Sequence, residues 1–397
     1  MVSLLQYSKN LSSTKNIPDP TTTSSSNRQR AWVEIDSNAL AYNVRQLRSI
    51  LSPQTALMAV VKADGYGHGA VEVAQTAIEN GATWLAVATL DEGVKLRQNG
   101  ITSPILLLGA INSPEEINEI AQWQLQATIC DGSQALMFSN TLQASLPVHL
   151  NLDTGMSRLG TNWQDALEFV SLVDKLPNLE IAGIYSHFAT ADDRDPEIMN
   201  LQHQRFQNAI AKIKAQGINP NLLHMANSAA TLQSSSFHHD LVRVGLAIYG
   251  LYPASHLQEK LTLKPVLQVK ARVTQVKKIT KGTGVSYGHK YICDRDMTIA
   301  VVGIGYADGV ARSLSKRLQA IIRGELVQQI GAITMDQMIV DVSHLDNLEP
   351  GEIVTLIGED GEHSITADDW ANSLDTISWE ILCGFKHRLH RIHHNDD

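Results

Sequence analysis

A chain of 397 residues is longer than one hydrophobic core usually organises, so its length predicts two domains. Hydrophobic residues make up 43% and the net charge is −9, which fits a globular protein and argues against nucleic acid or an anionic membrane as a partner. The three cysteines, Cys130, Cys293 and Cys383, are far apart and odd in number, which excludes a disulfide framework and fits a reducing compartment.

Residues 1–30 are expected to form a disordered leader, because they contain a run of threonine and serine at 21–26. A transit peptide is the minor alternative. The leader has no apolar core of the kind found in secretory signals, and no later stretch is long and apolar enough to span a bilayer. These features predict a cytoplasmic protein.

Within residues 31–260, short apolar runs alternate with amphipathic stretches that stop at glycine, as at Gly81, Gly100 and Gly217. The apolar runs lie at 56–61, 84–89, 105–109, 127–130, 148–152, 181–186, 222–226 and 242–250. About eight strands, each followed by a helix, predict an N-terminal (β/α)8 TIM-type barrel. An open doubly wound sheet would produce a similar pattern.

The pattern changes in residues 261–397. Leu267, Val269, Ala271 and Val273 alternate with polar residues, which is the period of a strand. Strand-like runs follow at 297–304, 320–327, 338–342 and 352–358, separated by turn residues. The predicted fold class is therefore α/β plus β, with a C-terminal mostly β domain to which the first strand region can contribute.

Lys62 is the first candidate for chemistry. It closes an apolar run and precedes a glycine-rich loop at 63–69. In a barrel, the carboxyl end of a strand is where active sites lie. A lysine that emerges from apolar walls loses solvation, so its pKa falls and its amine becomes nucleophilic, as a Schiff base requires. The alternative is a lysine that merely extends to solvent from the end of a strand.

Two features at late strands suit a phosphate group. Residues 225–230 follow one late strand and resemble a helix start capped by Asn227 or Ser228, and helix N-termini bind phosphate. Arg243 and Gly245 lie at the next late strand, where barrels commonly bind phosphate. Taken alone, each of these features more often has a structural role than a functional one. Their combination with Lys62 is what predicts a cofactor site.

Other site types lack their sequence patterns. The chain has no GxxxxGK[ST] motif, and its paired glycines at 282/284 and 303/305 lack the third glycine of a dinucleotide fingerprint. His387, His390, His393 and His394 gather in the C-terminal tail without an HExxH or CxxC motif. We interpret them as a solvated tail and expect no metal site.

Nine segments resemble, in order, the motifs of the alanine racemase family. They lie at 59–69, 152–160, 183–192, 226–229, 243–250, 284–288, 305–309, 335–337 and 376–378, and the similarity runs from residue 32 to about residue 391. The resemblance implies a (β/α)8 barrel, a β domain, pyridoxal phosphate and a homodimer with shared active sites. It also implies interconversion of L-alanine and D-alanine, which supplies D-alanine for peptidoglycan.

The resemblance also implies roles for residues around the cofactor. Lys62 would carry pyridoxal phosphate and act as one of two bases. Tyr287 of the partner subunit would be the base on the opposite face of Cα. Arg243 would hydrogen-bond the pyridine nitrogen, and because arginine does not protonate it, reprotonation at Cα would be favoured over transamination. The phosphate would be held by Tyr66, Ser228 and the backbone of Gly245 and Leu246.

Five further residues would handle the substrate or support the bases. Arg158 would orient Tyr287 and the substrate carboxylate, and His187 would link Tyr287 to Arg243. The substrate entrance and the carboxylate pocket would be shaped by Tyr306, Met335 and Asp336.

Two positions depart from the family pattern. Asn151 stands where many members have a lysine that becomes carbamylated and supports the neighbouring arginine. Trp379 stands where the family usually has a tyrosine on the phosphate, and an indole offers its single N–H in a different place. Phosphate binding is therefore not extended to Trp379.

Two other functions stay open at this point. A barrel racemase of broader specificity, acting on serine or basic amino acids, would share these motifs. A non-catalytic barrel protein for pyridoxal phosphate homeostasis is the less favoured alternative, because Tyr287 and the region 265–391 would have no place in it.

Overall fold

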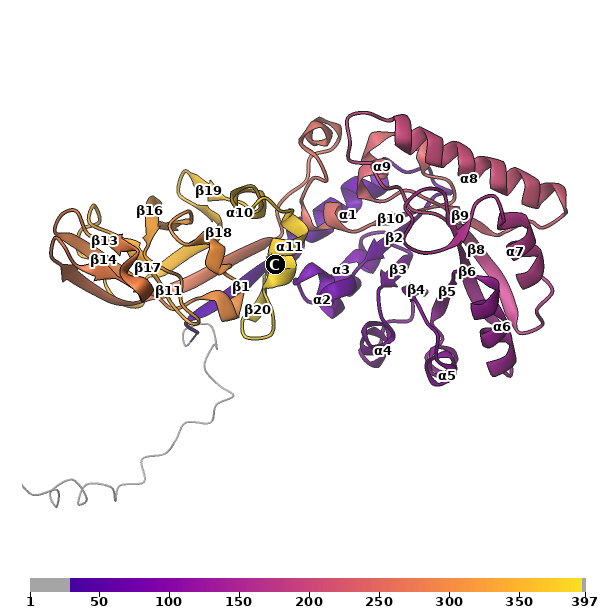
Figure 1. Ribbon diagram of the computed structural model, residues 1–397, viewed down its shortest axis with the longest axis horizontal. Coiled ribbons are helices and arrows are strands. Elements are labelled where there is room, and N and C mark those ends of the chain that lie inside the picture. Colours follow the sequence, from indigo (N-terminus) through magenta and orange to yellow (C-terminus); the bar gives the residue numbers. More distant parts are fainter. Residues whose placement is uncertain (1–28, 395–397) are drawn as a thin grey trace, which may run out of the picture.

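The computed structural model of the protein describes residues 29–394. The leader predicted at 1–30 therefore lies outside the described residues, apart from Gln29 and Arg30. Figure 1 shows two bodies side by side, a ring of strands and helices and an elongated body built mainly of strands.

The first body is a closed barrel of eight parallel strands in the order β10-β2-β3-β4-β5-β6-β8-β9. Two backbone bonds close the ring between β9 and β10: Asp240 N donates to Leu223 O at 3.0 Å, and Arg243 N donates to Ala226 O at 2.9 Å. Closure distinguishes this sheet from an open doubly wound one. The strands are β2 Ala56–Val60, β3 Trp84–Val87, β4 Ile105–Ala110, β5 Gln126–Ile129, β6 Leu146–Asp153, β8 Leu179–Tyr185, β9 Leu222–His224 and β10 Leu241–Val244.

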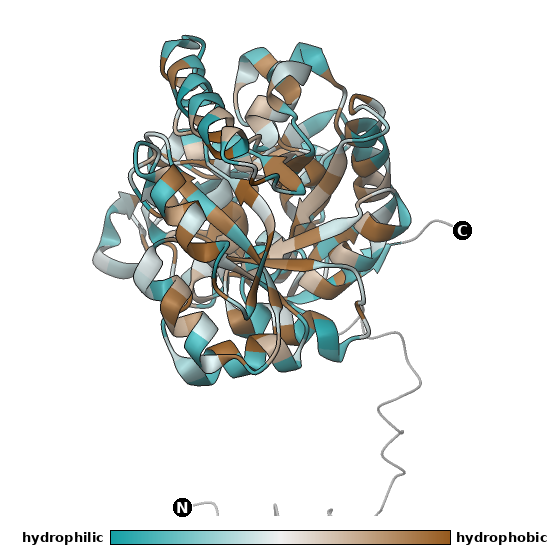
Figure 2. Cartoon of the chain, turned by 90° about the vertical axis from the view of Figure 1, so that its right-hand side faces the viewer, coloured by the Kyte–Doolittle hydropathy of each residue, from teal (hydrophilic) through white to brown (hydrophobic). Residues whose placement is uncertain are grey.

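Helices surround this barrel. They are α1 Ser37–Ser49, α3 Ala70–Glu79, α4 Leu90–Gln98, α5 Pro114–Gln122, α6 Gly132–Thr141, α7 Ala166–Val173, α8 Glu197–Ala215 and α9 Ser228–Gln233. Helices α3, α4 and α8 each end two residues before one of the glycines predicted to stop them. Figure 2 shows hydrophobic residues concentrated on the central strands and hydrophilic ones on the outer faces of the helices, so the core lies within and around the barrel.

The second body is a nine-stranded sheet in the order β19-β18-β15-β16-β17-β14-β11-β1-β20. The strand β1 pairs with β11 antiparallel and with β20 parallel, so the first described strand belongs to the β domain and α1 then leads into the barrel. The strands are β1 Ala31–Asp36, β11 Leu267–Ile279, β14 Met297–Val302, β15 Gln319–Ile322, β16 Glu325–Ile330, β17 Met338–Asp341, β18 Ile353–Asp360, β19 His363–Ile365 and β20 His390–His394.

Short elements complete the chain. They are α2 Lys62–Tyr66, β7 Thr161–Asn162, β12 Gly284–Val285, β13 Tyr291–Ile292, α10 Ala367–Leu374 and α11 Ser378–Gly384, together with 3-10 turns that include Leu246–Tyr249 and Tyr306–Asp308. Figure 1 shows α11 between the two bodies, beside α2.

Three sequence predictions need correction. The run 320–327 is a hairpin, because Arg323 and Gly324 adopt positive φ between β15 and β16. The run 242–250 keeps strand structure only to Val244 and then turns. Residues 390–394 of the histidine-rich tail form β20 along β1, a strand that was not predicted, although His387, His390 and His394 are exposed as in a solvated tail.

Gly250 lies at the exit from the barrel, where both its backbone conformation and its surroundings favour glycine. Its φ is +82°, and an added Cβ would lie 1.8 Å from Lys264 O. Gly282 has a φ of +84° with nothing within 4 Å of such a Cβ, so it is a matched control. Gly282→Ala should cost about 1–2 kcal/mol from backbone strain alone, and Gly250→Ala about 1–3 kcal/mol more from overlap. Denaturant unfolding measures the free energy of unfolding of both variants. Equal losses in Gly250→Ala and Gly282→Ala would contradict the close approach of Lys264 O to Gly250.

Candidate active site

A cavity of about 580 Å³ lies at the carboxyl ends of the barrel strands. Its lining brings together eight of the residues predicted from sequence: Lys62, Tyr66, Arg158, His187, Ser228, Arg243, Gly245 and Leu246. They come from segments as far apart as β2 and β10, which are neighbours in the closed sheet. The wall also includes Asn151 from β6 and Trp379 and Cys383 from α11.

Lys62 lies directly after β2, where the chain makes a left-handed turn. Ala63 and Asp64 both have φ of 53°, an unusual conformation for residues other than glycine. The turn is held by Glu92, which accepts from Ala63 N at 2.6 Å, and by Lys95, which pairs with Asp64 at 2.8 Å. Such backbone strain is typical of residues whose side chains must be aimed at a site.

The environment of Lys62 suits a nucleophilic amine. Burial lowers the pKa of Lys62, and the neighbouring charge of Arg158 lowers it further. A larger share of the side chain is therefore neutral near pH 7 than in an exposed lysine, and only the neutral amine can attack a carbonyl or accept a proton.

Neutral donors gather at one end of the cavity. The Ser228 hydroxyl accepts from Gly245 N at 3.1 Å and from Ala247 N at 3.3 Å. A Cβ on Gly245 would lie 2.5 Å from the Tyr66 hydroxyl oxygen, so only glycine permits this approach. The Asn227 side chain accepts from Ala230 N at 3.0 Å and is the cap of α9. Hydroxyls and backbone N–H groups at this spacing form a donor set suited to a phosphate.

Arg243 points into the barrel, and its guanidinium is buried. It donates to His224 Nδ1 at 2.9 Å, to Ser186 O at 2.9 Å and to His187 Nδ1 at 3.0 Å, and lies 5.0 Å from the centre of the Tyr185 ring. Burial lowers the pKa of Arg243 to about 10, so it stays a cation at neutral pH.

A chain of hydrogen bonds continues from Arg243 through the barrel interior. Because arginine only donates, His224 Nδ1 must accept, and His224 Nε2 then donates to His149 Nδ1 at 2.9 Å. His149 Nε2 donates in turn to Gln126 Oε1 at 2.9 Å. Burial lowers the pKa of His149 to about 3, so the chain is neutral and holds Arg243 in one orientation.

The hydrogen bond from Arg243 also orients His187. Its Nδ1 accepts from Arg243, so its Nε2 carries the proton and is left to serve the cavity that His187 lines. Burial and the charges of Arg243 and Arg158 lower the pKa of His187 to about 3, which keeps the ring neutral.

The remaining predicted residues lie in the β domain, outside the cavity wall. Tyr287 is 71% exposed, and Tyr306 and Met335 are exposed as well. Tyr306 N donates to Thr334 O at 3.0 Å, so the loops that carry Tyr306, Met335 and Asp336 are joined. Within one chain, the structure therefore assembles the barrel half of the predicted site and leaves the other half on an open surface.

Sequence reasoning missed the His149–His224 chain and Cys383. Both histidines interrupt apolar strand runs, at 148–152 and 222–226, and a polar residue inside a buried strand is a signal that could have found them. Burial raises the pKa of the Cys383 thiol, and its position on α11 gave no comparable signal.

Two findings concern other kinds of site. Within residues 29–394, no group of three or more His, Cys, Asp or Glu side chains is placed to bind a metal ion. In the same part of the chain, no helix is both long enough and apolar enough to cross a membrane.

A closed (β/α)8 barrel with a strand-end lysine at its mouth, followed by a β domain, defines a two-domain barrel enzyme. The model of the alanine racemase N-terminal domain matches residues 35–253, and that of the alanine racemase C-terminal domain matches residues 266–393. The chain belongs to the alanine racemase family.

Relatives and solved structures agree with this assignment. The chain is 64% identical to an alanine racemase of Nostoc sp. over 92% of its own length and 96% of the relative's. It is 60% identical to an alanine racemase of Synechocystis sp. over 92% of its length and 99% of the relative's. The crystal structure of alanine racemase from Bacillus anthracis with bound L-Ala-P matches with a TM-score of 0.88 at 35% identity, over 93% of this chain and 96% of that one.

The buried histidines predict how stability depends on pH. Because the folded-state pKa of His149 is about 3 and its ordinary value is 6.5, the unfolded chain binds a proton first as the pH falls. The stabilisation is complete above about pH 6.5 and is lost as the pH falls toward 3. His149→Asn keeps an oxygen that can accept from His224. At about pH 5, this variant should take up about one proton fewer on unfolding than the parent. Calorimetry of unfolding in two buffers of different ionisation enthalpy measures this proton uptake. Equal uptake by the parent and by His149→Asn would contradict a neutral His149 in the folded protein.

Proposed function

We propose that this protein interconverts L-alanine and D-alanine with pyridoxal phosphate bound at Lys62, and that the D-alanine supplies peptidoglycan synthesis. The observation that carries the proposal is the convergence, in one cavity, of a lysine of lowered pKa, a buried arginine cation and a phosphate-type donor set. Membership of the alanine racemase family supports the choice of alanine as substrate.

The residues present fit pyridoxal phosphate. The lowered pKa of Lys62 favours the neutral amine that covalent attachment to the cofactor aldehyde needs. Ser228, Tyr66 and the backbone of Gly245 and Leu246 would hold the phosphate, since all four line the same cavity and the Ser228 hydroxyl lies 3.1 Å from Gly245 N. When bound, the cofactor withdraws electrons from the substrate and makes its Cα–H acidic.

The proton chemistry falls to two groups on opposite faces of Cα. The Lys62 amine takes or gives the proton on one face, as its lowered pKa permits. Tyr287 of the partner subunit takes or gives it on the other. Arg158 orients the substrate carboxylate and Tyr287, and the neutral His187, with Nε2–H toward the cavity, links Tyr287 to Arg243. Exchanging the roles of the two bases reverses the reaction.

A homodimer would complete each site. Tyr287, Tyr306 and Met335 are large side chains on an open surface of the β domain, which favours their burial against another chain. A two-fold dimer lets each chain give its β domain to the other's barrel. In this proposal residues 31–260 bind the cofactor, and residues 261–397 complete the partner's site, with β1 in their sheet.

We assign the reaction to the cytoplasm. Cys130, Cys293 and Cys383 are free in the structure, which fits a reducing compartment. The substrate in this proposal is a small molecule, and no nucleic acid or membrane is involved.

Chiral analysis of the products tests the proposed activity. Incubation with L-alanine, L-serine, L-lysine and L-arginine should form mainly D-alanine, because the resemblance favours the smallest of these substrates. Lys62→Ala should lower the rate by about a thousandfold or more, since it removes both the attachment point and one base. Lys175→Ala, at an exposed lysine after α7, is the matched control.

Borohydride reduction of the purified protein should fix the cofactor on Lys62. A label on a different lysine would contradict the mechanism. Faster inversion of serine, lysine or arginine than of alanine would replace the proposal with a racemase of broader specificity.

Mixed dimers test the shared site. Lys62→Ala and Tyr287→Ala should each give a homodimer in which both active sites lack one of the two bases. In a mixed dimer, the Lys62→Ala chain supplies Tyr287 to its partner's intact Lys62, and one normal site returns. Random mixing makes half of the dimers mixed, each with one working site, so co-refolding should recover about a quarter of parental activity. No recovery in verified mixed dimers would mean that Tyr287 serves its own chain.

A further inference from the structure

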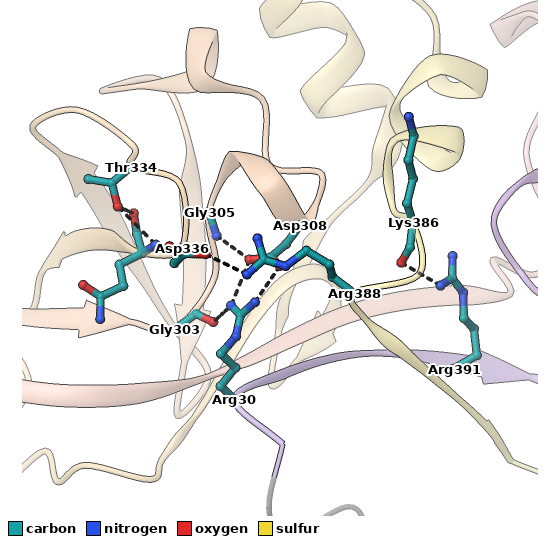
Figure 3. Close-up of polar contacts among 10 residues, drawn as sticks. Arg30, Gly303, Gly305, Asp308, Thr334, Asp336, Lys386, Arg388 and Arg391 are labelled. Atoms are coloured by element: carbon teal, nitrogen blue, oxygen red, sulfur yellow. Dashed lines mark hydrogen bonds and ion pairs between the residues drawn. The ribbon is translucent and has the colours of Figure 1, made fainter.

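A cluster of two arginines and two aspartates joins four distant segments of the chain near the predicted substrate entrance (Figure 3). At its centre is Asp308, whose side chain is 0% exposed. Arg30 donates to both carboxylate oxygens of Asp308, at 2.9 and 2.6 Å, and Gly305 N donates to one of them at 3.0 Å. Arg388 Nε lies 3.4 Å from Asp308, and its NH2 donates to Asp336 at 2.7 Å. The buried carboxylate thus fixes Arg388, which in turn reaches Asp336.

The cluster is attached rigidly to the loops that carry Tyr306 and Met335. Backbone N–H groups of Tyr306 and Ala307 donate to Thr334 O and Met335 O, both at 3.0 Å. A Cβ on Gly305 would lie only 2.3 Å from Thr334 O, so the two loops approach as closely as they do because position 305 is glycine. Movement of the cluster would therefore displace the side chains proposed to shape the entrance.

The segment that carries Arg388 is held from its other side by the barrel. Arg391 donates to Gly67 O at 3.0 Å, in the turn that follows Lys62, and to Phe385 O at 2.6 Å and Lys386 O at 2.8 Å. Figure 3 shows the Arg391 side chain reaching the backbone carbonyl of Lys386. The backbone around Arg388 is therefore held in place, and so is the carboxylate of Asp308 that its side chain contacts.

The charge of Asp336 explains why an arginine is needed there. Its side chain is 54% exposed, and Arg388 is its one ion-pair partner among the ion pairs formed in residues 29–394. An uncompensated carboxylate at an entrance repels the carboxylate end of an incoming amino acid. The guanidinium of Arg388 removes that repulsion and also fixes the orientation of Asp336.

We infer that Arg388 is a positioning residue for the substrate entrance, which it serves by neutralising and orienting Asp336 from its anchor on the buried Asp308. This inference rests on the proposed racemase function and deepens it. Arg30, which lies immediately before β1, supports the same anchor. The arrangement separates a structural pair, Arg30 with the buried Asp308, from an exposed functional pair, Arg388 and Asp336.

Steady-state kinetics with L-alanine test the inference. Arg388→Gln should raise KM about three- to tenfold and change kcat less than about twofold, because it affects substrate entry and not proton transfer. The rise should be larger at about 0.01 M than at about 0.15 M ionic strength, where charges are screened over ~30 and ~8 Å. In the double variant with Asp336→Asn, the rise should disappear, since no charge is left to neutralise.

Arg323→Gln is the matched control, because Arg323 also binds a carboxylate through two bonds, with Glu352, in the same domain. It should leave KM and kcat within about twofold of the parent. Asp336→Asn alone keeps an oxygen for Arg388 but leaves the arginine charge unopposed, so it should lower KM, most strongly at low ionic strength. This variant tests the role of the charge even if Arg388→Gln does not fold.

Three results would overturn the inference: an unchanged KM in Arg388→Gln, a rise that persists in the double variant, or a raised KM in Asp336→Asn. If the parental protein does not racemise alanine, the proposed function fails. If the parent racemises alanine and one of the three results is found, only the role of Arg388 fails.

Discussion

Burial of the Arg243 guanidinium is the constraint on which the site depends. A cation inside a barrel needs hydrogen-bond partners, and here the two terminal nitrogens of Arg243 donate to His224, to His187 and to the carbonyls of Ser186 and Met225. That requirement fixes the tautomers of both histidines and continues to His149. It also places a permanent positive charge near Lys62, where it helps to lower the lysine pKa. One buried charge thus sets the protonation states of its surroundings.

Much of the barrel and of its site could be predicted from the sequence. Barrel strands are buried on both faces, so they are continuous apolar runs, and each of the eight predicted runs overlaps one observed strand. Because the carboxyl ends of parallel strands meet at one mouth, Lys62, Ser228 and Arg243 could be predicted to converge from their positions at or just after the ends of strands. Their roles came from resemblance to a family, since strand position alone does not assign a reaction.

The rest depends on contacts that no local pattern reveals. Arg323 and Gly324 form a two-residue turn inside an apolar run, so one predicted strand is a hairpin. The tail at 390–394 is a strand only because β1 offers it an edge. Tyr287 is exposed within one chain, so the role proposed for it requires a second chain, which only the resemblance to a family implies. Long-range pairing and assembly are therefore the limits of sequence reasoning here.

The fate of the Cα hydrogen tests the central claim, that two bases on opposite faces invert alanine. The direct measurement is racemisation of protiated L-alanine in D2O, with early analysis of both enantiomers. Two bases predict that newly formed D-alanine carries solvent deuterium while the remaining L-alanine stays largely protiated, because Tyr287 of the partner subunit delivers a different proton from the one Lys62 removes. D-alanine that keeps a substantial share of the original protium would mean that one group serves both faces, and would contradict the account.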